Sequence, residues 1–97
     1  MRHFHRTHLA PDAALALADE FFPTIGVART ASAARSRAYS GTLGTMTLKI
    51  RADGGHSTML EVETDQMGES RLDRNVKKYF VKVRRAEDPA RDLEAAF

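Results

Sequence analysis

One segment constrains the fold of this 97-residue chain more than any other, because it separates into an apolar stripe and a basic face. The segment runs from Ser70 to Arg85, and at about 100° per residue its apolar side chains fall within one arc of a helix. The apolar stripe consists of Leu72, Val76, Tyr79, Phe80 and Val83. Such a helix must pack its stripe against a core, so the pattern predicts a long amphipathic helix over residues 70–86 that covers a sheet.

The opposite arc of this helix is basic, apart from one apolar side chain. It carries Arg71, Arg74, Lys78, Lys82 and Arg85, with Val81 as the exception. Ser70 precedes Asp73 by three residues, which is a capping-box pattern and places the start of the helix. We interpret the basic arc and Val81 as a surface for an anion or a protein partner. The alternative is that the arc is only the solvated face that any amphipathic helix shows.

A β-hairpin is predicted over residues 43–65, because apolar and polar residues alternate there with a period of two. Met46, Leu48 and Ile50 alternate in the first strand, and Thr58, Leu60 and Val62 alternate in the second. The connection contains Gly54 and Gly55, which supply the positive φ angles of a tight reversal. In this hairpin Lys49 is expected to face Glu61 as a cross-strand charge pair.

The remaining segments complete a single α+β domain. Residues 1–9 are predicted as a strand, with either Phe4 or the pair Thr7 and Leu9 facing inward. Residues 11–22 are predicted as a helix, since Pro11 suits a first helical position and Pro23 ends the helix. Residues 28–37 are small, polar and rich in arginine, which favours a loop, and residues 87–97 form a tail. The expected architecture is a small antiparallel sheet of about three strands, in the order β-α-β-β-α, packed against the C-terminal helix.

Composition narrows the classes of function. The chain has 15 Lys and Arg against 13 Asp and Glu, and a net charge of +2 is too small to indicate nucleic-acid binding by itself. It has no cysteine, which excludes disulfides, thiolate metal sites and cysteine nucleophiles. No apolar run approaches the roughly 20 residues of a membrane span, and no signal sequence is apparent. We therefore expect a cytoplasmic protein without a membrane span.

Catalytic and metal-binding patterns are weak. His3 and His5 would lie on one face of the first strand and could hold a metal ion if a third ligand came from elsewhere. No Asp, Glu or Cys pattern completes such a site, so we interpret both as residues of an exposed strand end. Glu61 and Glu63 share a strand face that is typical of the solvated side of a sheet. No nucleophile motif or phosphate-binding loop is present, so the sequence predicts neither an enzyme nor a cofactor.

The segment THLAPDAALALADEF, residues 7–21, resembles the opening of helix-grip domains, the START-like and polyketide-cyclase-like ligand-binding proteins. Residues 43–85, a strand pair followed by one amphipathic helix, are similar to the close of such a domain. The resemblance implies a reduced helix-grip domain whose last helix walls an apolar pocket. The pocket would be lined by Leu48, Leu60, Val76, Tyr79, Phe80 and Val83.

Three hypotheses of function follow. The first is a small non-catalytic interaction or accessory protein that is oligomeric, or docked in a larger assembly, through a sheet edge and the basic helix. Open sheet edges invite pairing with another chain, which favours a homo-oligomer or a protein partner. The first alternative is a domain that binds a small apolar ligand, as the helix-grip resemblance implies. The second alternative is non-specific nucleic-acid binding through the basic helix, by neutralisation of phosphates.

Overall fold

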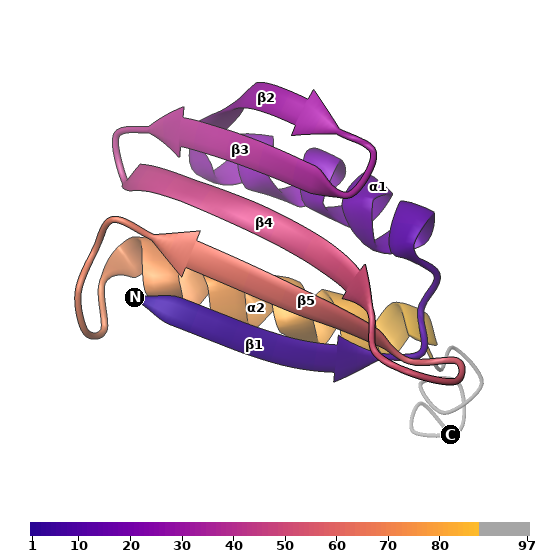
Figure 1. Ribbon diagram of the computed structural model, residues 1–97. Coiled ribbons are helices and arrows are strands. Elements are labelled where there is room, and N and C mark those ends of the chain that lie inside the picture. Colours follow the sequence, from indigo (N-terminus) through magenta and orange to yellow (C-terminus); the bar gives the residue numbers. More distant parts are fainter. Residues whose placement is uncertain (88–97) are drawn as a thin grey trace, which may run out of the picture.

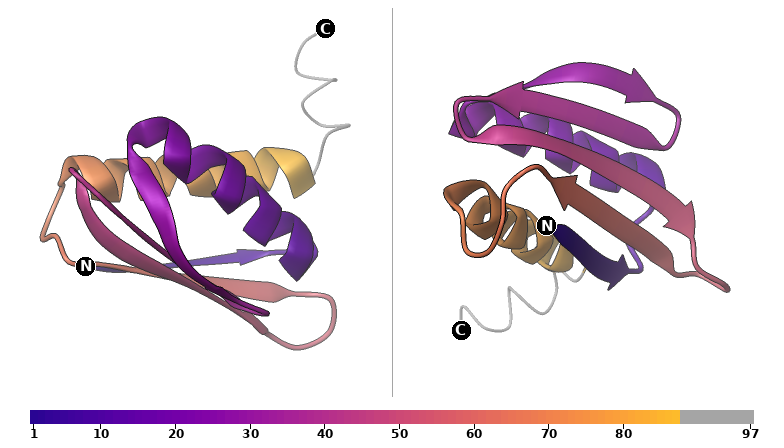
Figure 2. Two further views of the ribbon diagram at one scale, coloured as in Figure 1. Left: turned by 90° about the horizontal axis from the view of Figure 1, so that it is seen from above. Right: turned by 60° about the vertical axis from the view of Figure 1, so that its left-hand side comes forward.

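The computed structural model describes residues 1–87, which form a five-stranded antiparallel sheet with two helices on one face (Figure 1). The elements in chain order are β1 (Arg2–Thr7), α1 (Pro11–Phe21), the short 3-10 helix η1 (Phe22–Ile25), β2 (Val27–Ala33), β3 (Ser36–Gly41), β4 (Gly44–Ala52), β5 (Thr58–Thr64) and α2 (Arg71–Glu87). The strand order is β1-β5-β4-β3-β2, so the first strand pairs with the last one at one edge of the sheet. Figure 2 shows that both helices lie on the same side of the sheet and leave its other face open.

The α+β class is confirmed, but the expectation of about three strands is wrong. Residues 28–37, predicted as a loop, contain most of β2 and the beginning of β3, joined by a turn at Ala34 and Arg35. These strands are hard to detect because Val27 and Tyr39 are their only fully buried side chains. The backbone of β3 pairs with β4 and that of β2 pairs with β3. In addition, Asp19 of α1 accepts hydrogen bonds from Arg29, Arg37 and Tyr39 of these strands. The C-terminal helix, predicted to be long, spans only 17 residues.

The core lies between the sheet and the two helices. Three aromatic rings form its centre: Phe22 lies 5.1 Å from Tyr39 and 5.2 Å from Tyr79, measured between ring centroids. All three side chains are wholly buried, and aliphatic side chains of β4 and β5 pack around them. These ring contacts connect η1, which directly follows α1, with β3 and α2, so one core holds both helices on the sheet.

Strand alternation sets which residues face the helices. In β4 and β5 alternate residues are buried, and they include all six predicted ones and also Thr64. Lys49 lies opposite Glu61 in the register, as expected. In β1 the structure decides between two alternatives: Thr7 is buried, whereas 54% of Phe4 is exposed on the open face. The inward side of β1 therefore also carries His3 and His5, which face α2.

The two helices are joined to each other and begin at the expected residues. α1 has Pro11 in its first turn, and α2 is capped at Ser70, whose Oγ accepts a hydrogen bond from the Asp73 N–H at 3.0 Å. The Tyr79 hydroxyl donates a buried hydrogen bond of 2.8 Å to the Ala14 carbonyl and so connects α2 to α1. Within residues 1–87, neither helix has the length and apolar character needed to cross a membrane.

Candidate functional site

The basic residues of α2 lie together on the side of the helix that faces away from the sheet. Leu72, Val76, Tyr79 and Val83 are fully buried against the core, which turns the opposite arc outward. All five cations of this arc are exposed, and Val81 beside them is 43% exposed. We call the five cations the basic row; it consists of Arg71, Arg74, Lys78, Lys82 and Arg85.

Within residues 1–87, no member of the basic row forms an ion pair with a carboxylate. The acidic residues at the ends of α2 are engaged elsewhere. Glu69 binds Lys77, outside the row, with Oε1 and Nζ 3.2 Å apart. Glu87 accepts hydrogen bonds from the Thr7 hydroxyl at 2.9 Å and from the His8 N–H at 3.1 Å. Within residues 1–87, the carboxylates at the two ends of α2 therefore leave the basic row unpaired.

A groove of about 460 Å³ runs between α1 and α2 beside the C-terminal end of the basic row. It is lined by Leu17, Glu20, Phe21, Thr24, Lys82 and Arg85. Leu17 and Phe21 are only partly buried and supply apolar surface, and the Lys82 Nζ lies 5.6 Å from the centre of the Phe21 ring. At this distance the ammonium group and the ring attract each other, which holds the cation beside the apolar surface.

The α1 side of this groove was not predicted from the sequence. Residues 13–22 are apolar on almost every face, so the pattern does not show which side chains remain outside the core. One feature of the sequence could have indicated it: the helix has more apolar residues than a single buried stripe can hold. In a two-layer domain the remaining ones, such as Leu17 and Phe21, must lie at the border of the buried stripe.

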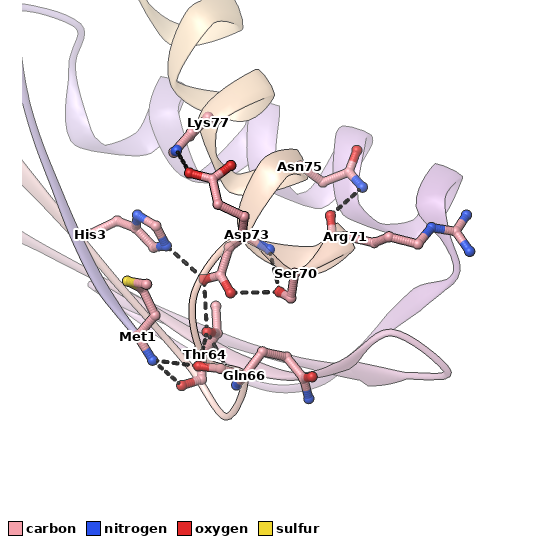
Figure 3. A network of polar contacts seen from close by, with 10 residues as sticks. Met1, His3, Thr64, Gln66, Ser70, Arg71, Asp73, Asn75 and Lys77 are labelled. Carbon is pink, nitrogen blue, oxygen red and sulfur yellow. Dashed lines mark hydrogen bonds and ion pairs between the residues drawn. The ribbon is translucent and has the colours of Figure 1, made fainter.

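A second cluster of polar side chains joins β1, β5 and the start of α2 (Figure 3). At its centre is Asp73, which is 2% exposed. Its carboxylate accepts hydrogen bonds from His3 Nε2 at 2.7 Å, Thr64 Oγ1 at 2.9 Å and Ser70 Oγ at 2.5 Å. Burial alone would raise the pKa of Asp73, but these three hydrogen bonds outweigh burial and hold its pKa below the usual value.

The cluster contains serine, histidine and aspartate, but their order does not suit nucleophilic catalysis. In a catalytic triad the imidazole lies between the hydroxyl and the carboxylate and acts as the base. Here the carboxylate of Asp73 lies between Ser70 and His3, so the hydroxyl donates to the carboxylate and has no imidazole beside it. The arrangement instead fastens the edge strand β1 to α2. The sequence indicated the Ser70–Asp73 cap but not His3, which is 70 residues away from Asp73.

The structure places His3 and His5 on one face of β1, each with a partner of its own. His3 binds Asp73, and the ring of His5 stacks on Phe80 with centroids 5.0 Å apart and an interplanar angle of 16°. Burial is the main cause that lowers the pKa of His5, whose Nε2 has no hydrogen-bond partner. Among residues 1–87 there is no group of three or more His, Cys, Asp or Glu side chains that could hold a metal ion.

The residues expected to line a ligand pocket lie in the core. Leu48, Leu60, Val76, Tyr79 and Val83 have no solvent-accessible surface, and Phe80 packs at the border of the same cluster. A side chain beside an internal void large enough for water would show accessible surface. The five buried side chains therefore fill the space between the sheet and α2 that the helix-grip resemblance assigns to a ligand.

A scan against protein-family models and searches of curated proteins and of solved structures found no match to this chain. The basic row and the groove beside it are therefore the features from which we infer a function.

Proposed function

We propose that this protein is a non-catalytic interaction protein whose helical layer docks an acidic, amphipathic segment of another protein. The observation that carries the proposal is the basic row, whose five exposed cations pair with no carboxylate of residues 1–87. Beside the row lies a groove of mixed character, in which Leu17 and Phe21 supply apolar surface. Charge complementarity of this kind guides encounter and selects partners, whereas apolar contacts supply most of the binding energy. The helical layer offers both features on one surface.

The spacing of the row indicates the shape of the partner. Its members follow one another at intervals of three or four residues, so they form a nearly straight line along α2. From Arg71 to Arg85 this line is about 21 Å long at 1.5 Å per residue. A partner helix of about four turns, with carboxylates at the same spacing, would match this line. An apolar side chain near its end would contact Leu17 and Phe21 in the groove.

The same charges argue against self-association through this surface. In a twofold dimer each protomer would present its basic row to the identical row of the other, and like charges would repel. A second copy would fit better along β2, an edge strand on which Val27 is the only buried residue. We therefore assign the basic row to a different protein, and the β2 edge to any homo-oligomer.

The two alternatives have less support. A small apolar ligand would need space that buried side chains of β4, β5 and α2 occupy. Non-specific binding of single-stranded nucleic acid normally combines cations with aromatic side chains for base stacking. The basic row contains none, and the Phe21 ring beside Lys82 is partly buried. Phe4, the most exposed aromatic side chain of residues 1–87, lies on the open face of the sheet.

Site-specific photo-crosslinking in the native host tests the proposal. In the test variant a photoreactive amino acid replaces Val81, which is exposed beside the basic row. In the matched control variant the same amino acid replaces Thr45, which is exposed on β4. The proposal predicts an adduct with an acidic protein from position 81 but not from position 45. The adduct should disappear when Lys78 and Lys82 are both replaced by glutamate, because the charge of the row is then reversed.

Three outcomes would contradict the proposal. Adducts of equal yield at both positions would show non-specific association. Adducts with nucleic acid from position 81 would favour nucleic-acid binding through the basic helix. A crosslink that survives the Lys78→Glu and Lys82→Glu replacements would show that the basic row does not select the partner.

A further inference from the structure

The groove between α1 and α2 lies close to the point where a segment of complementary chemistry joins the domain. Glu87 is the last residue of α2, and Arg85, two residues before it, lines the groove. The ten residues after Glu87 have the sequence DPARDLEAAF. We call residues 88–97 the C-terminal segment; it is attached at the end of the basic row that is nearest to the groove.

The charges of the groove and of the C-terminal segment are opposite in sign. Lys82 and Arg85 line the groove from α2, and Glu20 lines it from α1. The C-terminal segment has three acidic residues and one basic residue, which are Asp88, Asp92, Glu94 and Arg91. Its acidic residues therefore complement the two cations, and its one cation has a counterpart in Glu20. Such complementarity favours this segment over one of basic or neutral character.

The apolar residues of the two parts also correspond. Leu17 and Phe21 of the groove are one turn apart on α1 and are only partly buried. The C-terminal segment contains Leu93 and Phe97 at the same spacing of four. Residues four apart share one face of a helix, and the alanines of the segment favour that conformation. In a helix, Leu93 and Phe97 would thus present one apolar face to the groove.

The C-terminal segment is long enough to reach the groove. Lys82 lies about 7.5 Å before Glu87 along the helix axis, at 1.5 Å per residue. The six residues from Glu87 to Leu93 span up to about 20 Å when extended. Pro89 disfavours the α conformation of the residue before it, so the sequence favours a change of direction there over a straight continuation of α2. A connection this short gives the segment an effective concentration of about millimolar, at which weak contacts suffice.

We propose that the C-terminal segment occupies this groove in the free protein and competes with the docking partner for it. The proposal rests on the proposed docking function and adds its regulation. In the occupied state the acidic side chains lie beside Lys82 and Arg85, and Leu93 and Phe97 contact apolar surface of α1. The partner's apparent affinity is then lowered in proportion to the fraction of molecules with an open groove.

The length of the C-terminal segment leaves part of the basic row open. As a helix, ten residues are about 15 Å long, which is shorter than the row. Arg71 and Arg74 lie at the far end of the row and remain exposed for the first contact with a partner. A partner helix of four turns can therefore bind there first and displace the segment from the groove.

A nitroxide spin label attached to the C-terminal segment tests this contact. The chain has no cysteine, so Ala96→Cys provides a single labelling site. In the ¹⁵N-labelled full chain, the label should broaden the amide signals of Phe21 and Thr24 most, because both residues line the groove. A segment without a fixed binding site would broaden His8 at least as strongly, since the His8 N–H binds the Glu87 side chain next to the point of attachment.

Replacing Leu93 and Phe97 with serine removes the apolar contacts and should abolish the selective broadening. The same variant should bind a helical peptide of glutamate and leucine more tightly, by about twofold or more if the segment occupies at least half of the wild-type molecules. The matched control replaces Ala90 and Ala95 with serine, which keeps both large apolar residues. It should change neither the broadening nor the affinity for the peptide.

A charge swap tests the ionic part of the contact. Lys82→Glu with Arg85→Glu should also abolish the selective broadening, and both residues are exposed, so the fold should persist. Adding Asp92→Lys and Glu94→Lys to this variant should restore the broadening, because the complementarity returns with its signs reversed.

Equal broadening of His8 and Phe21, or no rescue by the charge swap, would overturn the proposal. Broadening in a mixture of spin-labelled ¹⁴N protein with unlabelled ¹⁵N protein would also overturn it, by showing that the segment binds a second copy. The docking proposal fails separately. Peptide binding without selective broadening refutes only the role of the C-terminal segment, whereas selective broadening without peptide binding in the Leu93→Ser, Phe97→Ser variant refutes the docking function.

Discussion

Asp73 shows how one side chain can fasten three elements of this small domain. A buried carboxylate is costly unless its oxygens accept hydrogen bonds, and the donors here come from β1, β5 and the residue before α2. The capping serine was readable from the sequence because it is local. His3 was not, because its separation of 70 residues from Asp73 is closed only by the pairing of β1 with β5. Thr64 was not, because its contact with Asp73 requires the connection between β5 and α2 to fold back.

Replacing Asp73 with asparagine should destabilise the protein by about 2–3 kcal/mol, because hydrogen bonds to a buried charged group are lost or weakened. Urea denaturation measures the change in the free energy of unfolding. The control is Glu69→Gln, which alters an exposed carboxylate that pairs with Lys77 and should change stability by about 0.5 kcal/mol or less. Equal effects of the two replacements would contradict the central role of Asp73.

Stability should also fall in acid. The pKa of Asp73 is lowered, and so is that of Asp19, where hydrogen bonds from Tyr39 and Arg37 outweigh the opposing effect of burial. A carboxyl whose pKa is lower in the folded state stabilises the fold above its unfolded-state pKa, and this contribution is lost as the pH falls through the folded-state pKa. The urea midpoint should therefore drop from about pH 5 towards pH 2, and less steeply in Asp73→Asn. An identical pH dependence in wild type and variant would argue against this coupling.

Helices and strands with a periodic pattern of buried apolar residues could be predicted from the sequence. Strands without such a pattern could not. The alternation in β4 and β5 and the stripe of α2 are visible because their side chains supply most of the core. β2 and β3 contribute Val27 and Tyr39 as fully buried residues, and their small exposed residues are also common in loops. Their backbone pairing and the hydrogen bonds of Arg29, Arg37 and Tyr39 to Asp19 leave no periodic apolar pattern in the sequence.

The contact between the two helices gives a prediction at this scale. Tyr79→Phe removes the hydroxyl that donates to the Ala14 carbonyl and keeps the ring that packs against Phe22. Loss of one buried hydrogen bond should cost about 1 kcal/mol in the free energy of unfolding, measured by urea denaturation. Val81→Ala, on the exposed side of α2, is the control and should cost about 0.5 kcal/mol or less. A Tyr79→Phe protein as stable as the wild type would show that this bond does not hold α1 on α2.

For the molecule as a whole, the position of the basic row could be predicted from the sequence, but the groove beside it could not. The basic row was predicted because all its members lie on one helix. The groove beside it requires the contact of α1 with α2, which no periodic pattern in the sequence specifies.

The most direct test of the central claim measures binding of an acidic amphipathic peptide to the basic row. The peptide is a labelled helix of about four turns with glutamates on one face and leucines beside them, and fluorescence anisotropy reports its binding. We expect saturable binding that weakens with added salt, is lost in the Lys78→Glu, Lys82→Glu variant, and persists in the Lys49→Glu, Arg51→Glu variant, whose changes lie on β4. No saturable binding, or the same loss in both variants, would contradict the docking proposal.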